Sequence, residues 1–221
     1  MSQELIHVYL MPGMAASPLI FENITLPKDK FKLHYLEWVL PHQNELLSAY
    51  AFRMTKNICH ENVVLLGVSF GGVLVQEMSK FLKIKKLIIV SSVKSRDEIP
   101  MHMQLADTTG AYKLLPTQLA SKIDVLEKYA FGKNFTKRLK LYKKFLSVND
   151  TQYLDWAIRN MVGWEQQEPI KGIVHIHGDN DAVFPIKYIQ DCIIIPKGTH
   201  IMIINRYKWF NEHLTDIILK D

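Results

Sequence analysis

The stretch Val63-Val64-Leu65-Leu66-Gly67-Val68-Ser69-Phe70-Gly71-Gly72 decides the fold of this chain. An apolar run leads into Gly-x-Ser-x-Gly, and the residues that follow, 73–78, are typical of a helix. A strand that passes directly into a helix needs a sharp turn. Gly67 and Gly71 permit one, because they lack the Cβ atoms that would clash across it. The pattern therefore predicts that Ser69 is held at the carboxyl edge of a sheet with its hydroxyl exposed.

Strand patterns recur on both sides of this motif and alternate with helix patterns. Strands are predicted over 5–10, 31–38, 63–68, 86–90, 173–177 and 192–195. Helices are predicted over 45–58 with Asn44 as the N-cap, over 70–82, and over 206–219. This alternation indicates an α/β fold, with a mostly parallel sheet of about six strands flanked by helices. The nearly continuous apolar strands fit, because strands covered on both faces lose their alternation.

The alternation stops in the middle of the chain, where no buried strand pattern is found. The segment 96–167 instead shows helix patterns over 117–131, 134–146 and 151–161. We therefore expect a core formed by residues 1–95 and 168–221, with a helical insertion over 96–167.

Composition narrows the class of protein. The chain has 221 residues, 48% of them hydrophobic, which is enough for a sizeable core. Its net charge of +5 comes without a nucleic-acid motif, so a solvated lysine-rich surface is favoured over a nucleic-acid partner. Cys59 and Cys192 are far apart and are expected to be free thiols in a reducing compartment. No signal-peptide pattern and no membrane-spanning apolar run is present, so a cytoplasmic location is expected.

A serine hydroxyl becomes a good nucleophile when a base takes its proton and a third group orients that base. Two segments after Ser69 offer such partners. His177-Gly178-Asp179-Asn180-Asp181 follows the fifth predicted strand, and Gly198-Thr199-His200 follows the sixth. The carboxyl ends of parallel strands meet at one edge of a sheet, so these segments are expected to lie near Ser69.

The residue types and their chain order resemble the α/β-hydrolase-fold serine hydrolases over nearly the whole length of the chain. The resemblance implies that Ser69 is the nucleophile, Asp181 the acid and His200 the general base. Asp179 is the alternative acid, although a turn-forming role suits it better. The resemblance also implies an oxyanion hole made by the backbone N–H groups of Phe70 and Met14, and a cap formed by the insertion. Many members have His-Gly before the second donor, whereas this chain has Pro12-Gly13.

The expected activity is hydrolysis of carboxylic esters of small to medium acids through an acyl-enzyme, with no cofactor and no metal. The expected partner is a small-molecule ester, and the sequence does not indicate an oligomeric state. Two alternatives stay open. The same fold can act on thioesters, lactones or C–C bonds, and a hydrolase homologue can bind a ligand without catalysis.

Three further features have less specific patterns. His175 and His177 share one face of a strand but lack a third metal ligand, so one packed strand histidine and one loop-edge histidine are favoured over a zinc site. The other histidines have no motif around them: His7, His34, His42, His60, His102 and His213. The insertion is rich in residues that suit an adaptable pocket or simply bury it on the core: Met101, Met103, Leu105, Tyr112, Leu114, Leu115, Trp156, Met161 and Trp164. The basic segment 134–146 is either a solvated face or attracts an anionic substrate, an acyl-carrier protein or a membrane surface.

Overall fold

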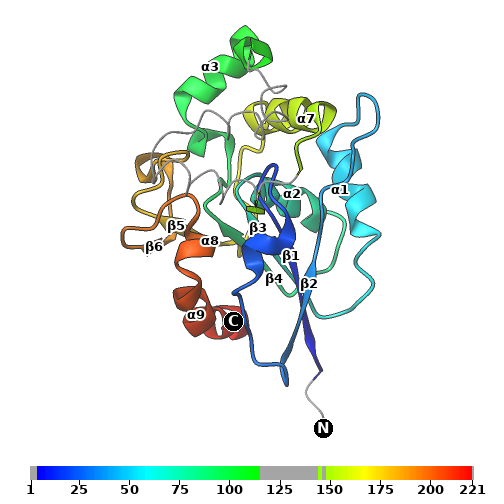
Figure 1. The fold of residues 1–221 in the computed structure, drawn as a ribbon, viewed down its shortest axis with the longest axis vertical. Coiled ribbons are helices and arrows are strands. Elements are labelled where there is room, and N and C mark those ends of the chain that lie inside the picture. Colours follow the sequence, from blue (N-terminus) through cyan, green and yellow to red (C-terminus); the bar gives the residue numbers. More distant parts are fainter. Residues whose placement is uncertain (1–3, 115–143, 146–147, 221) are drawn as a thin grey trace.

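The computed structural model describes residues 4–114, 144–145 and 148–220. Within them, six parallel strands form one sheet in the order β2-β1-β3-β4-β5-β6 (Figure 1). The strands are β1 (Ile6–Met11), β2 (Phe31–Tyr35), β3 (Val63–Val68), β4 (Lys86–Val90), β5 (Val174–Gly178) and β6 (Ile193–Ile195). This arrangement confirms the predicted six-stranded parallel sheet, with β3 in its interior.

Helices cover both faces of the sheet. The α-helices are α1 (Leu47–Thr55), α2 (Phe70–Ser79), α3 (Met101–Thr109), α7 (Thr151–Val162), α8 (Met202–Asn205) and α9 (Tyr207–Leu219). Short 3-10 helices are η1 (Pro18–Phe21), η2 (Arg96–Glu98), η3 (Ala111–Leu114) and η4 (Ile186–Tyr188). One apolar cluster packs α1, α2 and α7 against the sheet. A second packs η1, α8 and α9 against the opposite face.

The strands divide their side chains between these two clusters. In β1, Tyr9 and Met11 belong to the first cluster, whereas Val8 and Leu10 belong to the second. Successive side chains of a strand point to opposite faces, so a strand buried on both faces is apolar throughout. This is why the apolar run before Ser69 marks the centre of the sheet.

Between β4 and β5 the described residues form helices and no strand, so the structure has the predicted helical insertion. In Figure 1, α3 and α7 lie beyond the carboxyl ends of the strands. Trp156, Met161 and Trp164 are buried against the core, whereas Met101 and Leu105 are exposed on α3. The predicted helix over 117–131, and most of the one over 134–146, lie outside the described residues. Of the basic residues of 134–146, Lys144 is described, and it pairs with Glu22.

Several predicted element boundaries were wrong. The helices expected to end at residues 58 and 82 end at Thr55 and Ser79. The second strand ends at Tyr35, not at residue 38, because β2 is an edge strand whose pairing with β1 stops at Tyr35. The helix after it begins at Leu47 rather than Glu45. Asn44 does not cap it: its φ of 56° places it in a turn closed by the Glu45 N–H bond to the His42 carbonyl, and Leu46 is the N-cap.

Two further findings concern membrane-spanning helices and the cysteines. None of the helices in the described residues combines the length and the apolar character that crossing a bilayer requires. Cys59 is exposed, Cys192 is partly buried, and both are free thiols.

Candidate active site

Ser69 occupies the turn between β3 and α2. Its backbone conformation, with φ 54° and ψ −125°, is one that residues other than glycine rarely adopt. Neighbouring backbone hydrogen bonds hold it there. The Ser69 N–H donates to the Val90 carbonyl at 2.9 Å, and the Ser69 carbonyl accepts from the Gly72 N–H at 2.8 Å. The Ser92 hydroxyl also donates to that carbonyl, at 2.7 Å. A strained conformation persists where its surroundings over-determine it, and such residues cluster at functional sites.

The glycines of the motif are required by close backbone approach. A Cβ atom on Gly67 would lie 2.3 Å from the Gly71 carbonyl oxygen. A Cβ atom on Gly71 would lie 2.2 Å from the Pro12 carbonyl oxygen, in the loop after β1. Gly71 therefore lets the turn that carries Ser69 pack directly against the loop that carries Met14.

A second pair of glycines joins the two other loops of the site. A Cβ atom on Gly178, at the end of β5, would lie 2.2 Å from the Gly198 carbonyl oxygen. The same carbonyl accepts a hydrogen bond from the Asn180 N–H at 2.9 Å. The loop that carries Asp181 and the loop that carries His200 are thereby in direct backbone contact at the carboxyl edge of the sheet.

These loops place the three predicted side chains in one hydrogen-bonded line. The His200 Nε2 atom lies 3.0 Å from the Ser69 Oγ atom. The His200 Nδ1 atom lies 2.9 Å from one oxygen of Asp181 and 3.2 Å from the other. Asp179, the alternative acid, is exposed, and its backbone N–H contacts the β6 end at the Ile195 carbonyl. The structure thus brings Asp181, rather than Asp179, to His200.

The environment of Asp181 favours a charged carboxylate. Burial raises the pKa of this carboxyl, but the hydrogen bond and charge of His200 and the N–H groups of Phe184 and Val183 outweigh burial, so the pKa lies below its ordinary value. A carboxylate only accepts hydrogen bonds, so the proton of neutral His200 must be on Nδ1. The Nε2 atom is left as an acceptor that faces the Ser69 hydroxyl.

The loop after β1 is held by two side chains that sequence reasoning missed. The Trp38 Nε1–H donates to the Gly13 carbonyl at 2.8 Å, and the Ala15 N–H donates to the Tyr153 hydroxyl at 3.3 Å. In a trans peptide the N–H points opposite to the C=O, so the Trp38 bond directs the Met14 N–H away from Trp38. A Cβ atom on Gly13 would lie 3.3 Å from the Ser69 Cβ atom, so this peptide lies beside the serine.

A buried polar chain behind Asp181 was also missed. The His177 Nε2–H donates to the Phe184 carbonyl at 2.8 Å, in the same turn whose N–H groups bind Asp181. The His177 Nδ1 atom therefore accepts, and its partner is the Nε2 atom of His175 at 3.0 Å. Burial lowers the pKa of His175 to about 2 and also lowers the pKa of His177, so both are neutral. Their alternation on β5 was visible in the sequence, but their partners were not, and the expectation that one of them lies at a loop edge was wrong, because both are buried within the strand.

Comparisons with known proteins identify the fold. A scan against protein-family models and a search of curated proteins each returned no match. Solved structures do match. A bromoperoxidase from Bacillus anthracis has a TM-score of 0.67 at 17% identity and covers 99% of this chain and 93% of its own. A carboxylesterase from Nitrososphaera gargenis has a TM-score of 0.65 at 14% identity, and the match covers 99% of this chain and 92% of the carboxylesterase. An enol-lactonase from Burkholderia xenovorans LB400 has a TM-score of 0.63 at 12% identity, and the match covers 98% of this chain and 92% of the lactonase.

These matches span almost the whole chain. The chain has the α/β-hydrolase fold. At 12–17% identity the likeness concerns the fold alone, and a fold hosts many activities. Function has to be argued from the site.

Proposed function

We propose that this protein is a serine hydrolase that cleaves carboxylic esters of small to medium acids. The observation that carries the proposal is the continuous hydrogen-bonded line from the Ser69 hydroxyl through His200 to the buried Asp181. A purely structural role for any one of these residues would not require all three in this order. The proton assignment on His200 also gives each group the polarity that nucleophilic catalysis needs.

In the proposed reaction the Ser69 Oγ atom attacks the ester carbonyl carbon while its proton passes to the His200 Nε2 atom. The Asp181 carboxylate stabilises the imidazolium that forms. His200 then gives the proton to the departing alkoxide, which leaves as the alcohol. Water attacks the acyl-enzyme by the same route, transferring its proton to His200, and releases the acid and the free serine.

The proposed oxyanion hole consists of the Phe70 and Met14 N–H groups. Phe70 is the first residue of α2, where backbone N–H groups lack helical partners and the helix dipole favours negative charge. Met14 follows the peptide that Trp38 holds beside Ser69. Across the described residues, neither N–H is assigned to a backbone or side-chain acceptor, which supports their use as donors to a substrate oxygen.

Carboxylesterases and an enol-lactonase are both among the similar structures, so lactones are the first alternative substrates. Thioester and C–C bond hydrolysis are further alternatives with the same triad. A ligand-binding homologue without catalysis is the alternative from another class. We infer a small-molecule substrate in every case, because the reacting groups lie at the sheet edge below the insertion.

Fluorophosphonate labelling separates these possibilities. We expect the native protein to be labelled and Ser69→Ala to be unlabelled. Ser79→Ala is the control. It also removes a serine hydroxyl, but from the other end of α2, so this variant should be labelled like the native protein. A silent native protein would favour the binding homologue. A labelled protein that releases no p-nitrophenolate from acetate, butyrate or octanoate esters would overturn the ester assignment in favour of a lactone, thioester or C–C substrate.

A further inference from the structure

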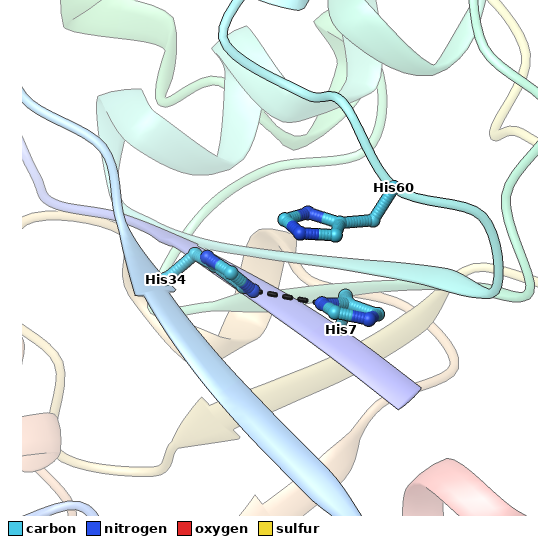
Figure 2. A group of neighbouring side chains, drawn as sticks. All are labelled: His7, His34 and His60. Atoms are coloured by element: carbon cyan, nitrogen blue, oxygen red, sulfur yellow. Dashed lines mark hydrogen bonds between the residues drawn. The ribbon is translucent and has the colours of Figure 1, made fainter. Parts of the chain in front are cut away.

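Three histidines outside the triad face one another on the sheet surface covered by α1 and α2. His7 on β1 and His34 on β2 are brought to this face by strand register, since Tyr9 pairs with His34 and lies two residues from His7. His60 reaches the same place from the segment between α1 and β3. Figure 2 shows the three rings together, with His60 lying over the other two. The His7 and His60 ring centroids are 3.8 Å apart.

One ring nitrogen from each histidine lies within 4.8 Å of the other two. The His7 Nδ1 and His34 Nε2 atoms are 2.9 Å apart (Figure 2). Zn²⁺ binds imidazole nitrogen at about 2.0–2.1 Å in a tetrahedral arrangement, which places ligand atoms roughly 3.3 Å from one another. The His7–His34 separation is slightly shorter than this value, and the His7 and His60 rings are stacked at 11°, so the rings must rotate for all three nitrogens to point at one ion.

We propose that His7, His34 and His60 bind a transition-metal dication, for which Zn²⁺ is the probe. This site does not depend on the hydrolase proposal. The group contains imidazoles alone, a donor set that suits Zn²⁺, Ni²⁺ and Cu²⁺ and not Mg²⁺ or Ca²⁺. Bound metal would join β1, β2 and the segment before β3. We therefore assign it a structural role at this edge of the sheet.

The residues around the three histidines leave the group open to solvent and orient the His60 ring. In the described part of the chain, an open depression of about 590 Å³ is lined by His34 and Tyr9, and no triad residue lines it. Of the three histidines, His34 alone is among its lining residues, but all three rings are partly exposed, so solvent and an ion can reach the group. Water would then occupy the fourth metal position. The Tyr9 hydroxyl lies 2.6 Å from the His60 Nδ1 atom, a contact of the kind that orients ligating histidines.

The charges around the group also bear on binding. Burial, followed by the charge of His60, lowers the pKa values of His7 and His34. Lys32 opposes a cation, whereas Glu4 near His7 favours one. The proton shared by His7 Nδ1 and His34 Nε2 must leave that position on binding. It moves to the other nitrogen of the same ring, and nothing is oxidised or reduced.

Equilibrium dialysis of the metal-stripped, tag-free full-length protein against Zn²⁺ tests the site. We expect one Zn²⁺ per chain, with the Kd at least tenfold weaker in His34→Gln and His60→Gln. His102→Gln, an exposed histidine on α3, should match the native protein within about twofold, as should His200→Gln. Absence of Zn²⁺ binding, equal affinity in all variants, or loss of binding in His200→Gln would each overturn the proposal.

A second measurement uses only the native protein and so does not depend on how a variant folds. Co²⁺ bound by three imidazoles and water should give the intense visible bands of a four-coordinate ion, and Zn²⁺ should displace it. Weak six-coordinate bands would contradict the site. In thermal denaturation, Zn²⁺ should raise the Tm of the native protein more than that of His34→Gln, since stabilisation by a ligand falls as its Kd rises. An equal rise in both would contradict it too.

Discussion

The two imidazole sites of this molecule lie on the same sheet but differ in construction. At the carboxyl edge, His200 has one buried carboxylate on one side and one hydroxyl on the other. At the β1–β2 edge, His7, His34 and His60 face one another with no carboxylate in the group. His7 pairs with Val63 at the start of β3, whereas Ser69 follows its end. The rise of a strand places these points roughly 20 Å apart.

The difference shows what a carboxylate does for a histidine. Asp181, whose side chain is fully buried, fixes the proton of His200 on one nitrogen and so defines a single direction of proton transfer. The three clustered imidazoles have no such partner and instead share protons among themselves and with Tyr9. The first arrangement suits acid–base chemistry, and the second suits a cation that replaces a shared proton.

The comparison is tested most strongly by removing the carboxylate charge. Asp181→Asn should lower kcat for a p-nitrophenyl ester by on the order of 10⁴-fold, because an amide can stabilise the wrong tautomer of His200 and cannot stabilise the imidazolium. Steady-state kinetics at pH 7.5 measures the loss.

Asp179→Asn is the matched control in the same loop. Asp179 is exposed, so this change should leave kcat within about threefold of the native value. If the two variants lost activity equally, or if Asp179→Asn lost more, the assignment of Asp181 as the acid would be wrong.

A smaller effect is expected from the loop beside Ser69. Trp38→Phe removes the donor to the Gly13 carbonyl while keeping an aromatic ring. The peptide that orients the Met14 N–H then loses its constraint, and we expect kcat to fall about ten- to hundredfold with little change in KM. Comparing kcat and KM on one ester separates this from a loss of substrate binding.

Trp164→Phe provides the control. It removes an equivalent donor, the Trp164 Nε1–H to a Glu77 carboxylate oxygen at 2.9 Å, away from the loop after β1. We expect a comparable loss of stability, about 1 kcal/mol, with an unchanged kcat. Equal loss of kcat in both variants would show that Trp38 acts through general stability rather than through the Gly13 peptide.

The sequence predicted those parts of the molecule that follow from local patterns. Gly67, Ser69 and Gly71 were identified from one short motif because the turn itself excludes bulk there, and the structure shows the expected close approaches. Asp181 and His200 were found because each follows a strand and the carboxyl ends of parallel strands converge. The structure shows the hydrogen bond between Asp181 and His200, whereas the catalytic roles of these residues stay a prediction.

What the sequence could not predict depends on contacts between distant segments. The Trp38 bond to Gly13 arises because the chain leaves the sheet after Tyr35, three residues earlier than the apolar pattern indicated. The cluster of His7, His34 and His60 depends on the register between β1 and β2 and on the path of the segment before β3. No spacing in the sequence encodes that juxtaposition. The division into core and cap over 96–167 also stays a prediction.

The smallest expected effect is on the free energy of unfolding, whose pH dependence should differ between a buried and a partly exposed histidine. His175 has a folded pKa of about 2, first because of burial and then because protonating it would be opposed by His177 and Lys94, against about 6.5 when unfolded. Below pH 6.5 the unfolded chain therefore binds a proton that the folded chain does not, so the free energy of unfolding falls as pH falls. From pH 7 to pH 6, His175 should contribute about 0.7 kcal/mol of this loss. Urea unfolding of His175→Gln at both pH values should show a loss smaller by that amount.

His34 supplies the contrast. Its pKa is lowered by burial and by His60, but the ring is only partly buried and water screens the repulsion. His34→Gln in zinc-free buffer should therefore change the pH dependence in the same direction as His175→Gln, but by less. Glu98, beside His175, has a pKa raised by burial and therefore acts in the opposite direction, but it is present in both variants. A larger change in His34→Gln than in His175→Gln would mean that the imidazole cluster at the β1–β2 edge is the more desolvated of the two, and the contrast drawn between an open and a buried site would be reversed.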